Sequence, residues 1–124
     1  MTNKKIILIE DERSIRDIYQ MILEDEDYQV ISANNGKQGL ELAEKNKPDL
    51  ILMDLMMPIL SGEETIRQLR ETDWGKHIPI IILTNIGASE VPESIIDENI
   101  KQILVKVELT PDQLVEKVKQ TLQS

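Results

Sequence analysis

LILMD, residues 50–54, consists of an apolar run from Leu50 to Met53 followed by an aspartate. Short apolar runs bounded by polar residues are typical of strands that are buried on both faces of a parallel sheet. Similar runs lie elsewhere in the chain, at residues 6–9, 80–83 and 103–105, with a weaker one at 30–33. The sequence therefore predicts five strands, one of which ends in Asp54.

Segments with helical periodicity lie between these runs. The clearest has apolar residues spaced three and four apart, which fall on one face of a helix: Ile15, Ile18, Tyr19, Ile22 and Leu23. Weaker patterns predict a second helix after Asn35 and Gly36 and a third helix after Ser61 and Gly62. These helices would connect the first four strands.

The last two predicted helices differ in how well their ends are marked. Thr110 is the predicted N-cap of the final helix, Pro111 suits its first position and Gln113 completes a capping box. The segment 87–99 has few apolar residues and is interrupted by Pro92, and a short helix is expected there. Alternating strands and helices predict the α/β class, with a doubly wound parallel sheet covered by helices on both faces.

Length and composition narrow the classes of protein that the chain can represent. At 124 residues and 40% hydrophobic content, one domain spanning 1–124 is expected, with no output domain. Fourteen Lys and Arg against 23 Asp and Glu give a net charge of -9, which opposes binding to nucleic acid or to an anionic membrane. The absence of cysteine excludes disulfides and thiol chemistry, and no signal peptide or membrane span is apparent, so a cytoplasmic location is expected.

Polar residues follow four of the predicted strands at the point where each strand ends. Glu10 and Asp11 follow the first strand, Asp54 the third, Thr84 the fourth and Lys106 the fifth. The carboxyl ends of parallel strands meet at one edge of the sheet, where ligands bind. Carboxylates gathered there would repel one another unless a cation lay among them, and oxygen ligands without His or Cys favour Mg²⁺.

The other groups at this edge suit a phosphoryl group. Lys106 would add a positive charge, Thr84 a hydroxyl donor and the loop after Asp54 backbone N–H groups. A carboxylate can form an aspartyl phosphate, so Asp54 is the predicted nucleophile, with Mg²⁺ and Lys106 neutralising the charge of the transferring group.

This set of residues resembles the receiver domain of two-component response regulators, and the resemblance covers essentially the whole chain. The matching motifs are ILIEDE at 7–12, LMDLMMP at 52–58 followed by Ser61 and Gly62, ILT at 82–84 and LVK at 104–106. The resemblance implies a flavodoxin-like (βα)5 fold with strand order 2-1-3-4-5.

The resemblance also implies a role for each residue of the site. Asp11 would bind Mg²⁺ directly and Glu10 mainly through water, while the carbonyl of Met56 would be a further ligand. Asp54 would be both ligand and phosphoacceptor, and Thr84 and Lys106 would contact the phosphoryl group. The phosphoryl donor would be a histidine kinase, a histidine phosphotransfer protein or a small molecule such as acetyl phosphate. A downstream protein would bind the face formed by residues 87–99, the fifth strand and the last helix, and the domain would act on no other substrate.

Two positions depart from the family pattern. Val107 stands where proline usually follows the lysine, and a trans peptide bond is expected because a non-proline cis bond costs about 3 kcal/mol. Ile103 replaces the usual Tyr or Phe three residues before the lysine. Either Thr84 and residues 86–95 respond to phosphorylation without an aromatic partner, or the domain transmits phosphorylation weakly.

Two other functions compete with a phosphorylation switch. A protein-binding module that works without phosphorylation is favoured by Ile103 and Val107 and opposed by the intact acidic set. A small Mg²⁺-dependent phosphatase is opposed by Met56, which stands where such enzymes use a second aspartate. For the switch itself, Met56 and Ile86 offer no side chain to position an attacking water, which predicts slow loss of the phosphoryl group.

Overall fold

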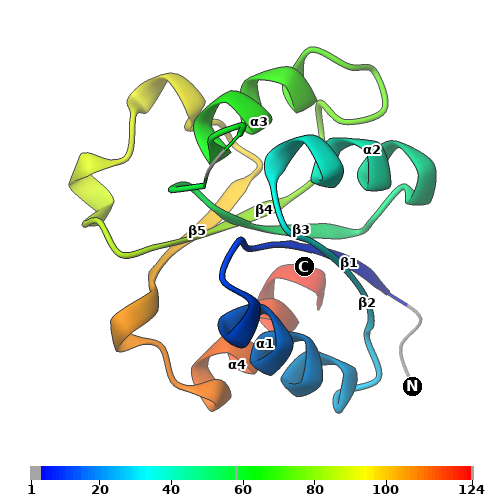
Figure 1. Cartoon of the computed structure of the whole chain (residues 1–124), viewed down its shortest axis with the longest axis vertical. Coiled ribbons are helices and arrows are strands. Elements are labelled where there is room, and N and C mark those ends of the chain that lie inside the picture. The colour runs from blue at the N-terminus through cyan, green and yellow to red at the C-terminus, as the bar shows by residue number, and fades with distance from the viewer. Residues whose placement is uncertain (1–3, 58, 124) are drawn as a thin grey trace.

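The computed structural model describes residues 4–57 and 59–123, so Pro58 and the ends of the expected 1–124 domain lie outside the described residues. Parallel strands form one sheet in the order β2-β1-β3-β4-β5 (Figure 1). The strands are β1 (Lys5–Ile9), β2 (Gln29–Ala33), β3 (Leu50–Asp54), β4 (Ile80–Thr84) and β5 (Ile100–Val105). The predicted fold class and strand order are confirmed.

Two pairs of helices cover the two faces of the sheet (Figure 1). One face packs against α1 (Arg13–Glu24) and α4 (Pro111–Gln123), and the other packs against α2 (Gly36–Asn46) and α3 (Gly62–Arg70). Side chains alternate between two apolar cores, as they must along a strand: Ile7, Ile9, Ile51 and Met53 face α2 and α3, while Ile6, Leu8, Leu50 and Leu52 face α1 and α4. Among the described residues, no helix has the length and apolar character needed to cross a membrane.

Side chains at the helix starts satisfy backbone N–H groups that have no partner within the helix. Asn35 Oδ1 accepts a hydrogen bond from the N–H of Gln38 at 2.9 Å, and Ser61 Oγ accepts one from Glu64 at 3.2 Å. Thr110 and Gln113 exchange side-chain to backbone hydrogen bonds of 3.0 and 3.2 Å. The predicted capping box of the last helix is confirmed.

The prediction of a short helix in residues 87–99 was wrong. This segment contains two short 3₁₀ turns instead, η1 (Ala88–Glu90) and η2 (Glu93–Ile95). Pro92 stands directly before η2 and has no N–H to donate, so it interrupts the hydrogen bonding of a continuous helix. Val91 and Ile95 still anchor the segment, because both side chains are buried.

Candidate functional site

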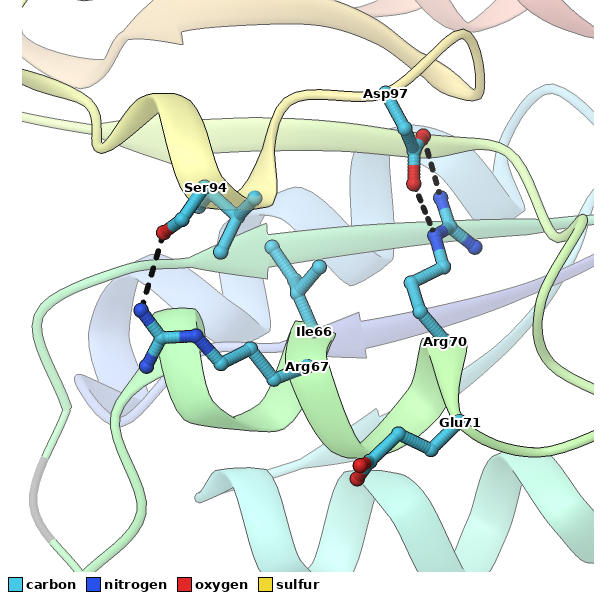
Figure 2. Close-up of a pocket in the computed structure, with 7 residues that line it drawn as sticks. Ile66, Arg67, Arg70, Glu71, Ser94 and Asp97 are labelled. Atoms are coloured by element: carbon cyan, nitrogen blue, oxygen red, sulfur yellow. Dashed lines mark hydrogen bonds and ion pairs between the residues drawn. The ribbon is translucent and has the colours of Figure 1, made fainter.

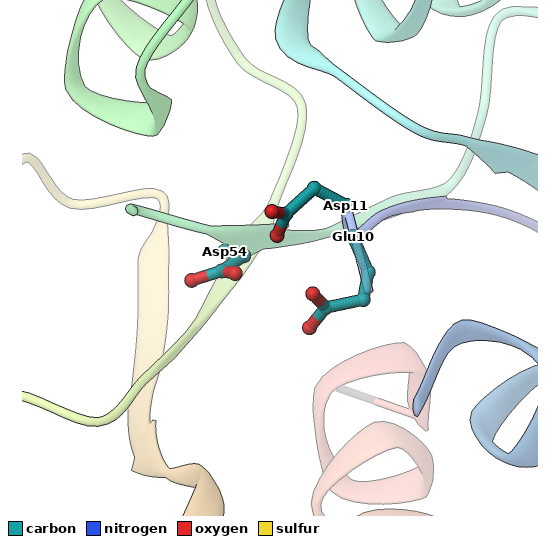
Figure 3. A group of neighbouring side chains, drawn as sticks. All are labelled: Glu10, Asp11 and Asp54. Carbon is teal, nitrogen blue, oxygen red and sulfur yellow. The ribbon is translucent and has the colours of Figure 1, made fainter. Parts of the chain in front are cut away.

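Three carboxylates meet at the carboxyl edge of the sheet. β1 and β3 are adjacent and pair Ile9 with Met53, so the residues that follow this pair, Glu10 just after β1 and Asp54 at the end of β3, lie side by side. Glu10, Asp11 and Asp54 each offer an oxygen, and these atoms all lie within 4.8 Å of one another (Figure 3). Glu10 and Asp54 are buried whereas Asp11 is exposed, so the cluster opens to solvent on the side of Asp11.

Lys106 joins the two buried carboxylates. It begins η3 (Lys106–Glu108), directly after β5, and its Nζ lies 2.9 Å from Glu10 Oε1 and 3.1 Å from Asp54 Oδ2. Burial lowers the pKa of Lys106, but the hydrogen bond to Glu10 and the charge of Asp54 outweigh burial and raise the pKa overall. Lys106 therefore remains a cation. The peptide bond to Val107 is trans, as expected, since none of the described peptide bonds is cis.

Glu10 is fixed by the loop that carries it. Its Oε2 accepts a hydrogen bond from the N–H of Glu12 at 3.0 Å, while Arg16 Nη1 donates to its carbonyl at 2.8 Å and to that of Asp11 at 3.5 Å. Burial raises the pKa of Glu10. The hydrogen bonds from the N–H of Glu12 and from the ammonium of Lys106 oppose this effect only in part. The role of Arg16 was not predicted from the sequence, because only its position in the first turns of α1 distinguishes it from the other arginines.

Backbone groups hold the strand ends on the other side of the site. The N–H of Met56 donates to Asp54 Oδ1 at 3.2 Å, so both oxygens of Asp54 accept a hydrogen bond. Thr84 is fully buried at the end of β4, and its Oγ1 accepts a hydrogen bond from the N–H of Ile86 at 3.2 Å. The cleft above these groups has a volume of about 360 Å³ and is lined by Asp11, Glu12, Asp54, Met56, Asn85 and Lys106.

The donor set fits a hard divalent cation. Three carboxylates gather around a single ammonium, which pairs with Glu10 and Asp54 only, so an excess of negative charge remains at the edge of the sheet. The carboxylate of Asp11 has no hydrogen bond or ion pair among the described residues and faces solvent. Oxygen ligands with space for water are what Mg²⁺ requires.

A second hollow lies away from this edge, between α3 and η2 (Figure 2). It measures about 320 Å³, and two arginines of α3 line it. Arg67 Nη2 donates to Ser94 Oγ at 3.0 Å, and Arg70 pairs with Asp97 at 2.8 Å. Because these arginines are already engaged by side chains of the protein, the hollow is a structural junction that ties the segment 87–99 to α3.

The fold and the acidic cleft together define a doubly wound α/β domain with a candidate cation site at the carboxyl edge of its sheet. The family model for the response regulator receiver domain matches residues 6–119, and the chain belongs to this family. It is therefore a receiver domain of two-component systems, a class of phosphorylation switches.

Curated relatives span several kinds of regulator. The chain is 45% identical over 82 residues to the alkaline phosphatase synthesis transcriptional regulatory protein PhoP of Bacillus subtilis, a match covering 66% of this chain and 33% of PhoP. It is 34% identical over 87 residues to sporulation initiation phosphotransferase F of Bacillus subtilis, covering 70% of this chain and 68% of that protein. The match to the response regulator DivK of Brucella anthropi covers 66% of DivK, so the chain spans from 33% to 68% of the length of these relatives.

Solved structures resemble the chain over nearly its whole length. The chemotaxis response regulator CheY4 of Vibrio cholerae has a TM-score of 0.87 and 28% identity, with 98% of this chain and 100% of that chain covered. The receiver domain of sensor histidine kinase PA1611 from Pseudomonas aeruginosa, solved with a magnesium ion in its active site cleft, has a TM-score of 0.87 and 26% identity, covering 99% and 100%.

Proposed function

We propose that the chain, taken over 1–124 as one receiver domain, accepts a phosphoryl group on Asp54 in a Mg²⁺-dependent reaction. The donor would be the phosphohistidine of a histidine kinase or of a phosphotransfer protein. The observation that carries the proposal is the position of Asp54 in the cleft, with one oxygen held by the N–H of Met56 and the other by Lys106. We also propose a cytoplasmic location, with which the absence of cysteine is compatible.

The transfer can be written in terms of the groups of this chain. An oxygen of Asp54 attacks phosphorus, the P–O bond forms as the P–N bond of the phosphohistidine breaks, and the departing imidazole nitrogen takes up a proton. Lys106 balances the charge of the incoming phosphoryl group from its place beside Asp54. Mg²⁺, held by Glu10, Asp11, Asp54 and the carbonyl of Met56, would neutralise charge on the phosphoryl oxygens.

Apolar side chains around the cleft support a protein as the donor. Val107 and Ile59 are each 79% exposed, and Ile18 is 48% exposed on α1. A hollow of about 180 Å³ beside the cleft is lined by Ile15, Ile18, Tyr19, Asn85, Lys106 and Val107. A partner that brings a phosphohistidine to Asp54 would cover this rim, which would account for apolar surface next to so acidic a cleft.

The output is proposed to leave through the carboxyl end of β4, next to Asp54. Thr84 would donate its hydroxyl hydrogen to a phosphoryl oxygen, and its present contact with the N–H of Ile86 would then change. Residues 86–95 follow directly, and with β5 and α4 they form the face on which a downstream protein is proposed to bind. A groove of about 390 Å³ between β5 and α4 offers space on this face.

A second function keeps one specific observation in its favour. Ile103 occupies the position of the usual aromatic residue and is only partly buried against the core, so the common aromatic coupling to Thr84 is absent. A receiver-like module that binds its partner without phosphorylation would need no such coupling.

Labelling with acetyl phosphate separates these functions. Wild type incubated with Mg²⁺ and acetyl phosphate is expected to form a hydroxylamine-labile adduct on Asp54, detected by mass spectrometry. Asp54→Asn should form none, whereas Asp73→Asn, which changes a fully exposed carboxylate, should label like wild type. Absence of an adduct on the wild type would refute phosphorylation of Asp54 and favour the binding module.

A further inference from the structure

Met56 is the apolar exception among the residues that line the acidic cleft. The other five lining residues carry carboxylate, amide or ammonium groups. The side chain of Met56 is 66% exposed, and its own backbone N–H holds Asp54 Oδ1 at 3.2 Å. A thioether therefore forms part of the wall beside the proposed phosphoryl site and is open to solutes in the surrounding water.

The other described methionines supply internal comparisons. Met21 on α1 is 64% exposed, nearly the same as Met56, but it does not line the cleft. Met53 is fully buried in β3, and Met57 is half-buried against the core. Because oxidation of methionine requires access to sulfur, peroxide should reach Met56 and Met21 and should spare Met53.

We propose that Met56 is an oxidation site through which peroxides shorten the lifetime of the phosphoryl group on Asp54; this inference rests on the proposed function. In the step, the sulfur of Met56 attacks the terminal oxygen of a hydroperoxide. An S–O bond forms as the O–O bond breaks, so the sulfur is oxidised by two electrons and the peroxide leaves as water or an alcohol. The product, a methionine sulfoxide, is polar, and methionine sulfoxide reductases reverse its formation.

The sulfoxide would supply a hydrogen-bond acceptor at the one lining position whose side chain is apolar. Hydrolysis of an aspartyl phosphate requires a water placed in line with phosphorus, and neither Met56 nor Ile86 carries a polar side-chain atom that could hold one. The sulfoxide oxygen is a hydrogen-bond acceptor at the same position, so it can orient a water in the way that the carbonyl oxygen of a glutamine side chain would. Oxidation therefore converts a long-lived phosphoryl group into a shorter-lived one.

The test compares lifetimes before and after mild hydrogen peroxide treatment. Peptide mass spectrometry is expected to find sulfoxide at Met56 and Met21 but not at Met53. The treated wild type and the untreated Met56→Gln variant should lose the phosphoryl group severalfold faster than untreated wild type. Met56→Leu should keep its lifetime after treatment, Met21→Leu should respond like wild type, and treatment with the reductases should restore the original lifetime.

Two outcomes would overturn the inference, and a third would overturn the proposed function as well. Confirmed sulfoxide at Met56 with an unchanged lifetime would refute the effect on hydrolysis. If Met56 stayed unmodified while Met21 was oxidised, the sulfur of Met56 would not be accessible to peroxide, and the inference would be refuted. In both cases the adduct itself still forms; a lack of adduct on the untreated wild type would remove the proposed function and the inference together.

Discussion

Lys106 Nζ donates hydrogen bonds to Asp54 at 3.1 Å and to Glu10 at 2.9 Å, so a single ammonium serves two buried carboxylates from different strands. The side chain of Lys106 is itself only 10% exposed. Each of the three charges would be costly to bury alone, and their arrangement makes the stability of the domain depend on the same contacts as its proposed chemistry.

Replacing Lys106 by methionine should leave two buried carboxylates without a cationic partner, each with only one backbone N–H donor among the described residues. We expect Lys106→Met to lower the free energy of unfolding by about 3 kcal/mol without divalent cations. Urea unfolding followed by the fluorescence of Trp74 measures this change. Lys101→Met is the matched control, because Lys101 lies on β5, the strand that precedes Lys106, and is exposed. Equal losses in the two variants would contradict a special role for Lys106.

Asp11 and Glu12 are adjacent exposed carboxylates with different predicted roles. Asp11 belongs to the group that could hold a metal, whereas Glu12 is the N-cap residue of α1 and uses its N–H to hold Glu10. Asp11→Asn should weaken Mg²⁺ binding by at least about tenfold, and Glu12→Gln should change it little. Calorimetric titration of each variant with Mg²⁺ provides the comparison. Similar affinities in both variants would show that Asp11 is not a ligand.

Gly62 allows the start of α3 to approach the backbone at the end of β3, at Asp54 and Leu55. A Cβ at this position would lie 2.3 Å from the carbonyl oxygen of Asp54 and 2.6 Å from the Cα of Leu55. Because neither backbone atom can move without displacing Asp54, Gly62→Ala should lower the free energy of unfolding by about 1–3 kcal/mol and reduce labelling. Gly87→Ala, whose Cβ would meet nothing closer than 4.0 Å, is the control and should do neither.

The sheet could be predicted from the sequence because both of its faces are covered, which makes β3 and β4 continuous apolar runs. The gathering of Glu10, Asp54 and Lys106 follows from strand ends meeting at one edge. The sequence could not show that residues 87–99 form short turns and not a helix, because the few apolar residues around Pro92 are compatible with either structure. Ile18 likewise fits the apolar stripe of α1 but is 48% exposed, because periodicity identifies a face and not what covers it.

Tyr28 should make the domain sensitive to alkaline pH. Burial raises the pKa of its phenol, with Lys119 opposing and Glu26 assisting. Because the pKa of Tyr28 is raised in the folded state, the contribution of Tyr28 to the free energy of unfolding is complete below its unfolded pKa of about 10. This contribution is lost as the pH rises through the folded pKa. Urea unfolding across this range should give a steeper fall in stability for wild type than for Tyr28→Phe. Lys119 and Tyr19, whose pKa values are also raised, are present in both proteins. Parallel curves would contradict the prediction.

Arg70 should be the least replaceable contact between α3 and the segment that precedes β5. Its Nε and Nη2 donate to the two oxygens of Asp97 at 2.8 and 3.4 Å (Figure 2). Its Nη1 donates to the carbonyls of Gly75 and Ile78 at 2.9 and 2.8 Å. The side chain is only 14% exposed, so these bonds are shielded from water. Lysine offers one compact charge and cannot reach both a carboxylate and two carbonyls with this geometry.

We therefore expect Arg70→Lys to lower the free energy of unfolding by about 1–3 kcal/mol, and hydrogen exchange to accelerate in residues 93–99. Arg67→Lys is the matched control on the same helix. Arg67 is 45% exposed and pairs with Glu63 and Glu64, so its replacement should cost less than about 1 kcal/mol. Acetyl phosphate labelling of Asp54 should persist in both variants, because neither arginine lines the acidic cleft. If exchange in residues 93–99 were unchanged in Arg70→Lys, the buried apolar side chains Val91 and Ile95, and not the ion pair, would be what holds this segment against α3.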